Sequence, residues 1–214
     1  MTHADDPMRE SEAEGRALET AVRFLEANRE GVLAFGDTLV KVKLVADPAG
    51  GRLLASVPVA TFFESEHILW VPEETDDAMQ LLVSPEETGE SVTSDRWLAF
   101  HGEPEHVRWA WLWIDSAKHG PWVFDGDVMV PANSVAEVES ELVRRFNADK
   151  AELAAIAERA TGTSVADPLC VGVDQHGMYV RARFGVLRIE WDRELDGEDA
   201  ARGHVVKLIE EHKQ

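Results

Sequence analysis

The sequence contains very little cysteine or tyrosine, with one residue of each among 214. A single thiol, Cys170, can form neither an internal disulfide nor a multi-cysteine metal site, which is typical of proteins from a reducing cytoplasm. Long hydrophobic runs are missing too, because stretches such as residues 109–114 are far too short to cross a bilayer. The N-terminus has neither the basic start nor the apolar segment of a secretory signal. We therefore expect a cytoplasmic protein without a membrane partner.

Basic residues are also scarce. The chain has 21 lysines and arginines against 41 aspartates and glutamates, which gives a formal net charge of −20. A surface this acidic repels the phosphates of nucleic acids, so we expect no DNA or RNA partner. The imbalance is strongest between Glu64 and Glu105, where Arg96 is the single lysine or arginine. Such a run is typical of a solvated face, and a basic protein partner could also recognise it.

The first part of the chain has the pattern of one helix followed by a β-barrel. Apolar residues recur at helical spacing over residues 11–28, and Gly31 is the expected stop. About seven short strand-like segments follow between residues 32 and 130, and they include residues 96–102 and 128–130. A short helix capped by Thr75 is expected over residues 76–83. This pattern predicts an antiparallel barrel or sandwich.

The pattern changes at Ser134, which with Glu137 forms a predicted capping box. A helix should run from there to Gly162, with a break at residues 147–149, because Asn and Asp favour helix caps. A hairpin over residues 169–183, a third strand over 186–191 and a helix over 197–211 are expected to follow. The prediction is an α+β protein with two domains, residues 1–132 and residues 133–214.

Three segments of the second domain carry a family resemblance: residues 144–151 (Arg-Arg-Phe-Asn-Ala-Asp-Lys-Ala), 170–177 (Cys-Val-Gly-Val-Asp-Gln-His-Gly) and 186–189 (Val-Leu-Arg-Ile). Together they resemble the C-terminal, DUF2470-type domain of the haem-utilisation (HugZ-like) family. There this domain follows a split β-barrel of the pyridoxamine 5′-phosphate oxidase, FMN-binding type. Residues 53–58 and 69–71 extend the resemblance more weakly over the barrel. The resemblance implies an N-terminal split barrel, a small helix, three-stranded sheet and helix domain, and a homodimer that binds flavin or haem.

The sequence departs from the family at the groups that do chemistry. Arg145, Phe146 and Lys150 stand where the family has His, Met and His. Residues 73–77 (Glu-Glu-Thr-Asp-Asp) occupy the neighbourhood that helps to hold the FMN phosphate in the flavin-binding relatives. A helix N-terminus attracts phosphate, but here the acids would satisfy it with the protein's own oxygens. We therefore expect no FMN in the usual pose.

Six residues are candidates for a ligand site elsewhere. Lys41 and Lys43 alternate along one strand face, and Arg52 lies across a hairpin loop from them, so the three form an alternative phosphate site. Trp111 and Trp113 share a strand face that could form an aromatic wall for a planar ligand, although we favour a barrel core or a dimer seam. His119, in a predicted loop, could ligate haem iron if haem binds.

The leading hypothesis is a divergent member of the split-barrel group, a ligand-binding or haem-related protein without the usual FMN phosphate site. One alternative is an FMN-dependent oxidoreductase whose phosphate site is formed by Lys41, Lys43 and Arg52. The other is a non-enzymatic regulatory protein whose acidic face docks a basic partner. No catalytic residue follows from the sequence, which lacks a phosphate-binding loop, a nucleophile elbow and a zinc-protease motif.

Overall fold

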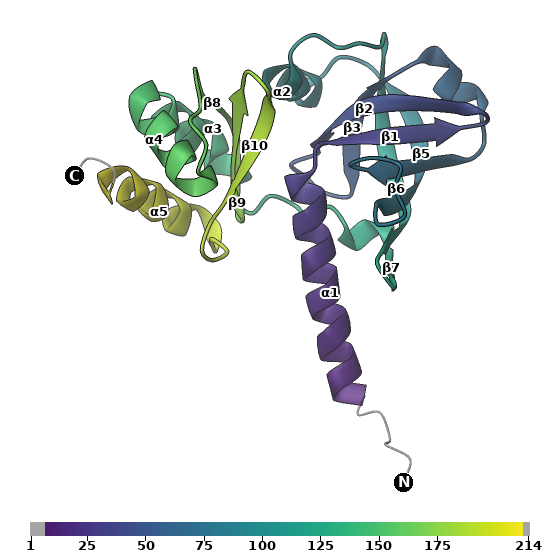
Figure 1. Cartoon of the computed structure of the whole chain (residues 1–214), viewed down its shortest axis with the longest axis horizontal. Coiled ribbons are helices and arrows are strands. Elements are labelled where there is room, and N and C mark those ends of the chain that lie inside the picture. The colour runs from purple at the N-terminus through teal and green to yellow at the C-terminus, as the bar shows by residue number, and fades with distance from the viewer. Residues whose placement is uncertain (1–6, 212–214) are drawn as a thin grey trace. The chain divides into compact units, whose positions relative to one another are not determined.

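The computed structural model describes residues 7–211, which divide into two compact units (Figure 1). The barrel unit contains the chain up to Ser94 and the segment Pro104–Pro131. The C-terminal unit contains Asp95–Glu103 and the chain from Ala132 onward. The chain therefore passes between the two units three times. No helix within residues 7–211 combines the length and the apolar composition that a membrane crossing requires.

The barrel unit begins with helix α1 and continues with seven strands. Their bounds are α1 (Pro7–Ala27), β1 (Glu30–Phe35), β2 (Thr38–Ala46), β3 (Arg52–Val57), β4 (His67–Val71), β5 (Met79–Thr88), β6 (Arg108–His119) and β7 (Trp122–Asp125), with short 3-10 turns η1 (Val59–Phe63) and η2 (Gly126–Val128). The strand order is β3-β2-β1-β4-β5-β6-β7, and all neighbours are antiparallel. Pairing of β3 with β6 closes the first six strands into a barrel. The predicted α+β class with an antiparallel barrel is confirmed.

Side chains alternate across the barrel wall, as strand geometry requires. On β6, Ala110, Leu112 and Ile114 belong to the buried core, together with residues from the other strands and from α1. Trp111 and Trp113 alternate with them and therefore lie on the outer face of the barrel. The interpretation of this tryptophan face as barrel core was wrong, because the smaller residues of β6 fill the interior.

Two predicted elements of the barrel change their type in the structure. Residues 96–102, expected as a strand, belong to helix α2 (Val92–His101). Ser91 and Ser94 cap its first turn reciprocally, since each backbone N–H donates to the other residue's hydroxyl, at 2.7 and 3.3 Å. Of residues 76–83, expected as a helix, the first three form a loop and the rest begin β5. There Met79, Leu81 and Val83 are buried at strand spacing, and this period of two determines the structure.

Two smaller predictions in this unit were also wrong. Gly31 does not end α1 but lies in β1, where an added Cβ would approach the carbonyl oxygen of Trp70 to 2.6 Å. Close approach of β4 is therefore the reason for glycine at this position. Residues 128–130 form no return strand, because the chain turns through η2 instead.

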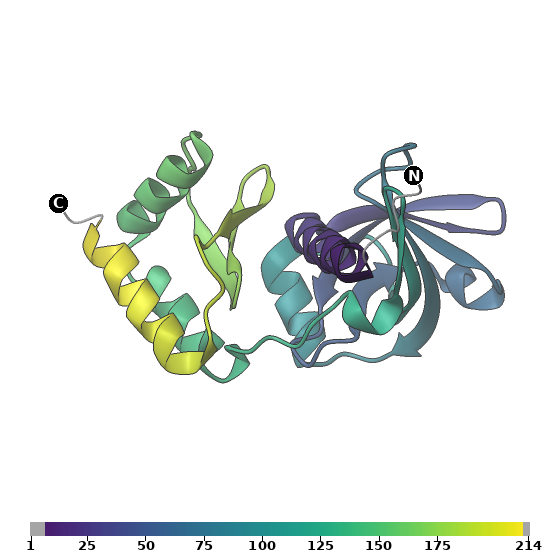
Figure 2. The ribbon, with the colours of Figure 1, turned by 90° about the horizontal axis from the view of Figure 1, so that it is seen from below.

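The C-terminal unit has a three-stranded antiparallel sheet between helices. Its elements are α3 (Ala136–Phe146), α4 (Lys150–Thr161), β8 (Leu169–Asp174), β9 (Gly177–Ala182), β10 (Gly185–Glu190) and α5 (Gly197–Glu211), with strand order β10-β9-β8. Helices α3, α4 and α5 cover one face of the sheet (Figure 2). Helix α2 covers the other face, where the Phe100 ring lies 5.1 Å from that of Tyr179 on β9. Arg96 of α2 also pairs with Glu139 of α3 at 2.6 Å. The predicted hairpin, third strand and final helix are confirmed.

The residues that carry the family resemblance hold this unit together. Asn147, at the predicted helix break, donates to the carbonyl of Cys170 and accepts its N–H, both at 2.8 Å. Asp149 caps α4, and Gly162 ends it in a left-handed conformation. Asp174 accepts two N–H groups of the hairpin turn and forms a bidentate pair with Arg188.

The predicted capping box at Ser134 was wrong. The N-cap of α3 is Val135, which makes no side-chain capping bond. Ser134 instead donates its N–H to the side chain of Gln175 at 3.2 Å, and the Asn133 side chain accepts the N–H of Val135 at 3.0 Å. Tertiary contacts with the β8–β9 turn therefore fix the start of this helix.

Candidate functional site

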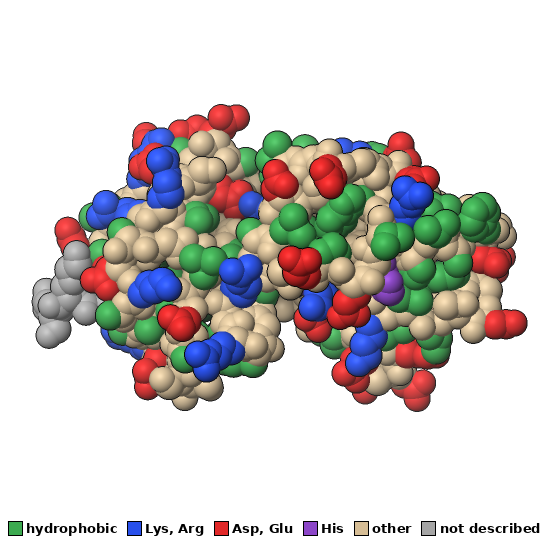
Figure 3. All heavy atoms as spheres, turned by 90° about the horizontal axis from the view of Figure 1, so that it is seen from above, with side chains coloured by type: hydrophobic (Ala, Val, Ile, Leu, Met, Phe, Trp, Pro, Cys, Tyr) green, Lys and Arg blue, Asp and Glu red, His purple; other side chains and the backbone are tan. Residues whose placement is uncertain are grey.

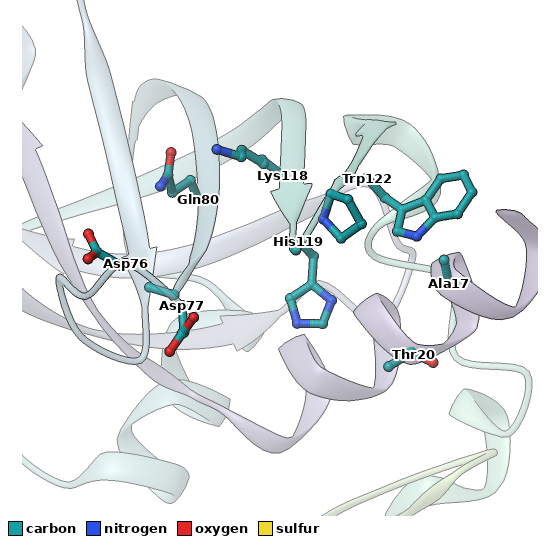
Figure 4. A pocket seen from close by; sticks show the side chains of 11 residues that line it. Ala17, Thr20, Asp76, Asp77, Gln80, Lys118, His119 and Trp122 are labelled. Carbon is teal, nitrogen blue, oxygen red and sulfur yellow. The ribbon is translucent and has the colours of Figure 1, made fainter.

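A pocket of about 400 Å³ opens at one end of the barrel unit (Figure 4). Helix α1, the loop between β4 and β5, the end of β6 and the β6–β7 turn surround it. Its lining residues are Ala17, Thr20, Asp76, Asp77, Ala78, Gln80, Lys118, His119, Gly120, Pro121 and Trp122. This volume lies within the usual range of small-molecule sites, about 300–1,000 Å³.

The acidic wall of the pocket is the β4–β5 loop. Asp76 and Asp77 are both exposed, and Ala78 closes the turn by donating its N–H to the carbonyl of Thr75 at 3.1 Å. No helix begins at this loop, so the expected helix N-terminus does not exist and its partial positive charge is absent as well. The two carboxylates line a pocket instead of capping a helix.

The opposite wall carries an imidazole. His119 is the last residue of β6, not part of a loop as expected, and its ring lies 4.9 Å from that of Phe24 on α1. In Figure 4 the imidazole lies between Asp77 and Thr20, whereas Lys118 and Gln80 lie toward the other side of the pocket. Strand alternation explains this division, because neighbouring residues of β6 point to opposite faces.

The lining combines two carboxylates, one imidazole, one ammonium group and a small apolar floor. No arginine lies among the lining residues, and the two carboxylates outnumber the one lysine. This arrangement favours a ligand that is neutral or carries a positive charge over one that carries a phosphate dianion. Sequence reasoning missed Thr20, because no local pattern indicates which side of α1 faces the β6–β7 turn.

Three of the sequence-predicted ligand residues meet on the outer face of the barrel. The β3–β6 register places Arg52 opposite Trp113 and Leu54 opposite Trp111. The guanidinium carbon of Arg52 lies 3.8 Å from the ring centroid of Trp111 and 4.9 Å from that of Trp113. Its Nε donates to Asp47 at 2.8 Å, a partner that the sequence analysis did not identify.

The two lysines lie elsewhere on this face. Lys41 pairs with Val32 of β1, and Lys43 pairs with Glu30. Asp47, which lies beside Arg52, is four residues beyond Lys43, a separation of roughly 13 Å along an extended chain. The structure therefore does not bring the two lysines and Arg52 together around one phosphate.

Comparison with known proteins gives similarity in structure but none in sequence. No protein-family profile matches the chain, and no curated protein is similar to it. Atu2129 of Agrobacterium tumefaciens, a protein of unknown function, matches with a TM-score of 0.72 and 13% identity over 91% of this chain and 96% of its own. A heme-binding protein from Mycobacterium smegmatis matches with a TM-score of 0.39 and 17% identity, over 92% and 98% of the two chains. The likeness to Atu2129 shows a shared split-barrel fold alone, and the weaker likeness carries no functional argument.

Proposed function

We propose that this protein is a ligand-binding member of the split-barrel group, related to the haem-utilisation family, that has lost the phosphate site of its flavin-binding relatives. The observation that carries the proposal is the pocket that joins Asp76, Asp77 and His119 at the end of the barrel. Its acidic lining disfavours FMN, while its size suits a small organic molecule. The ligand that fits this lining carries an amine or another cationic group next to a small apolar body.

A matched pair of probes tests this proposal. Tryptamine and indole-3-acetate share a ring system and carry charges of opposite sign. We expect calorimetric titration to give tighter binding of tryptamine, and we expect the Asp76→Asn/Asp77→Asn variant to lose this preference. Asp127→Asn, which removes an exposed carboxylate outside the pocket, should retain it. Equal or tighter binding of indole-3-acetate by the unmodified protein would contradict the proposal.

A second candidate ligand is haem, with His119 as the iron ligand. The supporting observation is that His119 is the one histidine among the lining residues of the pocket. Neutral imidazole is a common axial ligand of haem iron. Titration with haemin should then give a Soret shift that His119→Ala abolishes and His106→Gln retains. A shift that survives His119→Ala would exclude this ligation.

We also infer a homodimer, and an exposed apolar row on the barrel supports it. Cross-strand pairing places Leu39, Ala34, Ile68 and Leu82 side by side on four neighbouring strands. Leu39, Ile68 and Leu82 are 56%, 37% and 45% exposed. Hydrophobic side chains also reach the surface of the barrel unit in the view of Figure 3. Monomeric proteins rarely expose large contiguous apolar patches.

Charges beside the row favour a second copy as the occupant. Lys41 and Lys118 are exposed on one side of the row, and Asp37 and Glu66 are exposed on the other. A two-fold axis along the row would place the lysine side of one copy opposite the acidic side of its partner. Sedimentation should therefore give a dimer that Ile68→Glu dissociates. Val107→Glu, at an exposed valine outside the row, should leave the dimer intact. A monomer for the unmodified protein would overturn the inference.

A further inference from the structure

Arg52 is held in place before any ligand arrives. Its Nε donates to Oδ2 of Asp47 at 2.8 Å, while Oδ1 of this buried aspartate accepts the N–H of Ala49 at 3.0 Å. Its guanidinium also lies over the Trp111 ring, with 3.8 Å between the guanidinium carbon and the ring centroid. An arginine fixed on two sides loses little further side-chain entropy when it binds a ligand.

Most N–H groups of the Arg52 guanidinium are not used in the bond to Asp47. A guanidinium carries five N–H groups, and the bond to Asp47 uses one of them. Within residues 7–211, the terminal nitrogens of Arg52 donate no hydrogen bond, and 28% of the side chain is exposed. Two parallel N–H groups on the edge of a guanidinium match two acceptors that lie side by side on a planar ligand.

Trp113 adds a stacking surface next to these donors. It lies directly opposite Arg52 in the β3–β6 register and is 40% exposed. Its indole N–H donates to Oε2 of Glu86 at 2.7 Å, which fixes the orientation of the ring. Proteins that bind single-stranded nucleic acids stack heteroaromatic bases on such rings.

The surrounding charge selects a neutral ligand. Asp47 balances the charge of Arg52, Glu86 adds a negative charge beside Trp113, and the whole chain carries a net charge of −20. A phosphate group would be repelled here, whereas the acceptor atoms of an uncharged ring would not. We propose that Arg52 and Trp113 form a second binding site, outside the His119 pocket, for a neutral heteroaromatic ring that presents two adjacent hydrogen-bond acceptors.

Guanine and flavins both have such an edge, and the two sources can be distinguished. The O6 and N7 atoms of guanine form the acceptor pair that arginine recognises in a bidentate manner, whereas adenine replaces one acceptor with a donor. Titrations that follow tryptophan fluorescence should use guanosine, riboflavin and adenosine, together with guanosine monophosphate and FMN as charged counterparts. We expect guanosine or riboflavin to bind at least tenfold more tightly than adenosine. We also expect each to bind more tightly than its phosphorylated counterpart, and this difference should shrink in high salt.

Variants of matched arginines complete the test. Arg52→Lys keeps the charge but removes the paired donors, so it should weaken binding of the preferred ring at least tenfold. Arg108→Lys changes another arginine of the barrel surface, whose partner is Glu87, and should bind as the unmodified protein does. Thermal unfolding of both variants should show that they remain folded. The proposal is overturned if neither ring binds, if Arg52→Lys binds unchanged, or if the phosphorylated ligands bind more tightly.

Discussion

Asn147 belongs to a segment that carries the family resemblance, and in the structure it links a helix connection to the sheet. It lies between α3 and α4, and its side-chain amide forms two hydrogen bonds to the backbone of Cys170 on β8. Asp149 then starts α4 by accepting the N–H groups of Ala151 and Glu152. The helix break was predictable, because both residue types favour caps. The bond to β8 was not, since it joins positions 23 residues apart.

Replacement of Asn147 should therefore weaken the C-terminal unit. Asn147→Ala leaves an N–H and a carbonyl of the buried Cys170 without this partner, so we expect a loss of roughly 2–4 kcal/mol in the free energy of unfolding, about 1–2 for each group. Urea denaturation measures this change. Arg145→Ala, two positions earlier at an exposed site, is the control and should change stability little. Equal stability of both variants would rule out this role of Asn147.

Cys170 should be chemically silent in the folded protein. Burial is the main cause that raises the pKa of its thiol from 9.0 to about 12, so almost no thiolate exists at pH 8. Because the folded pKa exceeds the unfolded one, the stability that this thiol contributes is complete below about pH 9 and is lost as the pH rises toward 12. A thiol reagent at pH 8 should label the native protein slowly and the denatured protein stoichiometrically. Rapid labelling of the native protein would refute the burial argument.

At the scale of elements, the sequence predicted those helices and strands whose apolar residues follow one clear spacing. The C-terminal hairpin, its third strand and its final helix are where alternation and helical spacing placed them. Short mixed segments were not predictable in the same way. Trp97 and Phe100 have helical spacing, but residues 96–102 are short enough to read as a strand between strands. Burial of Phe100 against Tyr179 of the C-terminal sheet decides the structure, and no local pattern records that contact.

The candidate site was predictable only in part. The sequence singled out His119 and the acidic residues 73–77 separately, and the fold brings His119, Asp76 and Asp77 together in one pocket. The reason given for the acids was wrong, because it required a helix that is absent. Arg52 and the tryptophans do meet, but their contact depends on the β3–β6 pairing that closes the barrel.

Two glycines in the C-terminal unit predict stability changes of opposite sign, and the first of them, Gly172, tests how α2 docks. At Gly172 an added Cβ would lie 2.8 Å from both Nη2 of Arg96 and Cζ of Phe100, so Gly172→Ala should push α2 away and cost about 1–3 kcal/mol. At Gly203, within α5, an added Cβ meets nothing within 4 Å, so Gly203→Ala should stabilise the protein by about 0.5–1 kcal/mol. Urea denaturation of both variants measures the two signs. A stabilising effect of Gly172→Ala would show that α2 does not pack closely on β8.

At the scale of the whole molecule, a split-barrel fold is combined with a strongly acidic chain. The chain folds into a split barrel and a C-terminal helix and sheet unit, and its net charge is −20. By the family resemblance, residues 73–77 occupy the neighbourhood that helps to hold the FMN phosphate in flavin-binding relatives, and two of them, Asp76 and Asp77, line the pocket. Residues 73–77 therefore offer carboxylates, and no helix N-terminus, to an approaching phosphate group.

The most direct test of this central claim is the amount of flavin in the purified protein. An absorption spectrum of the full chain, purified after expression in flavin-replete cells and incubated with excess FMN before desalting, gives the molar ratio of flavin to protein. The acidic β4–β5 loop, which offers neither a helix N-terminus nor an arginine, predicts a molar ratio of FMN to protein near zero. A ratio near one would contradict the account, because it would show that the barrel still binds FMN despite Asp76 and Asp77.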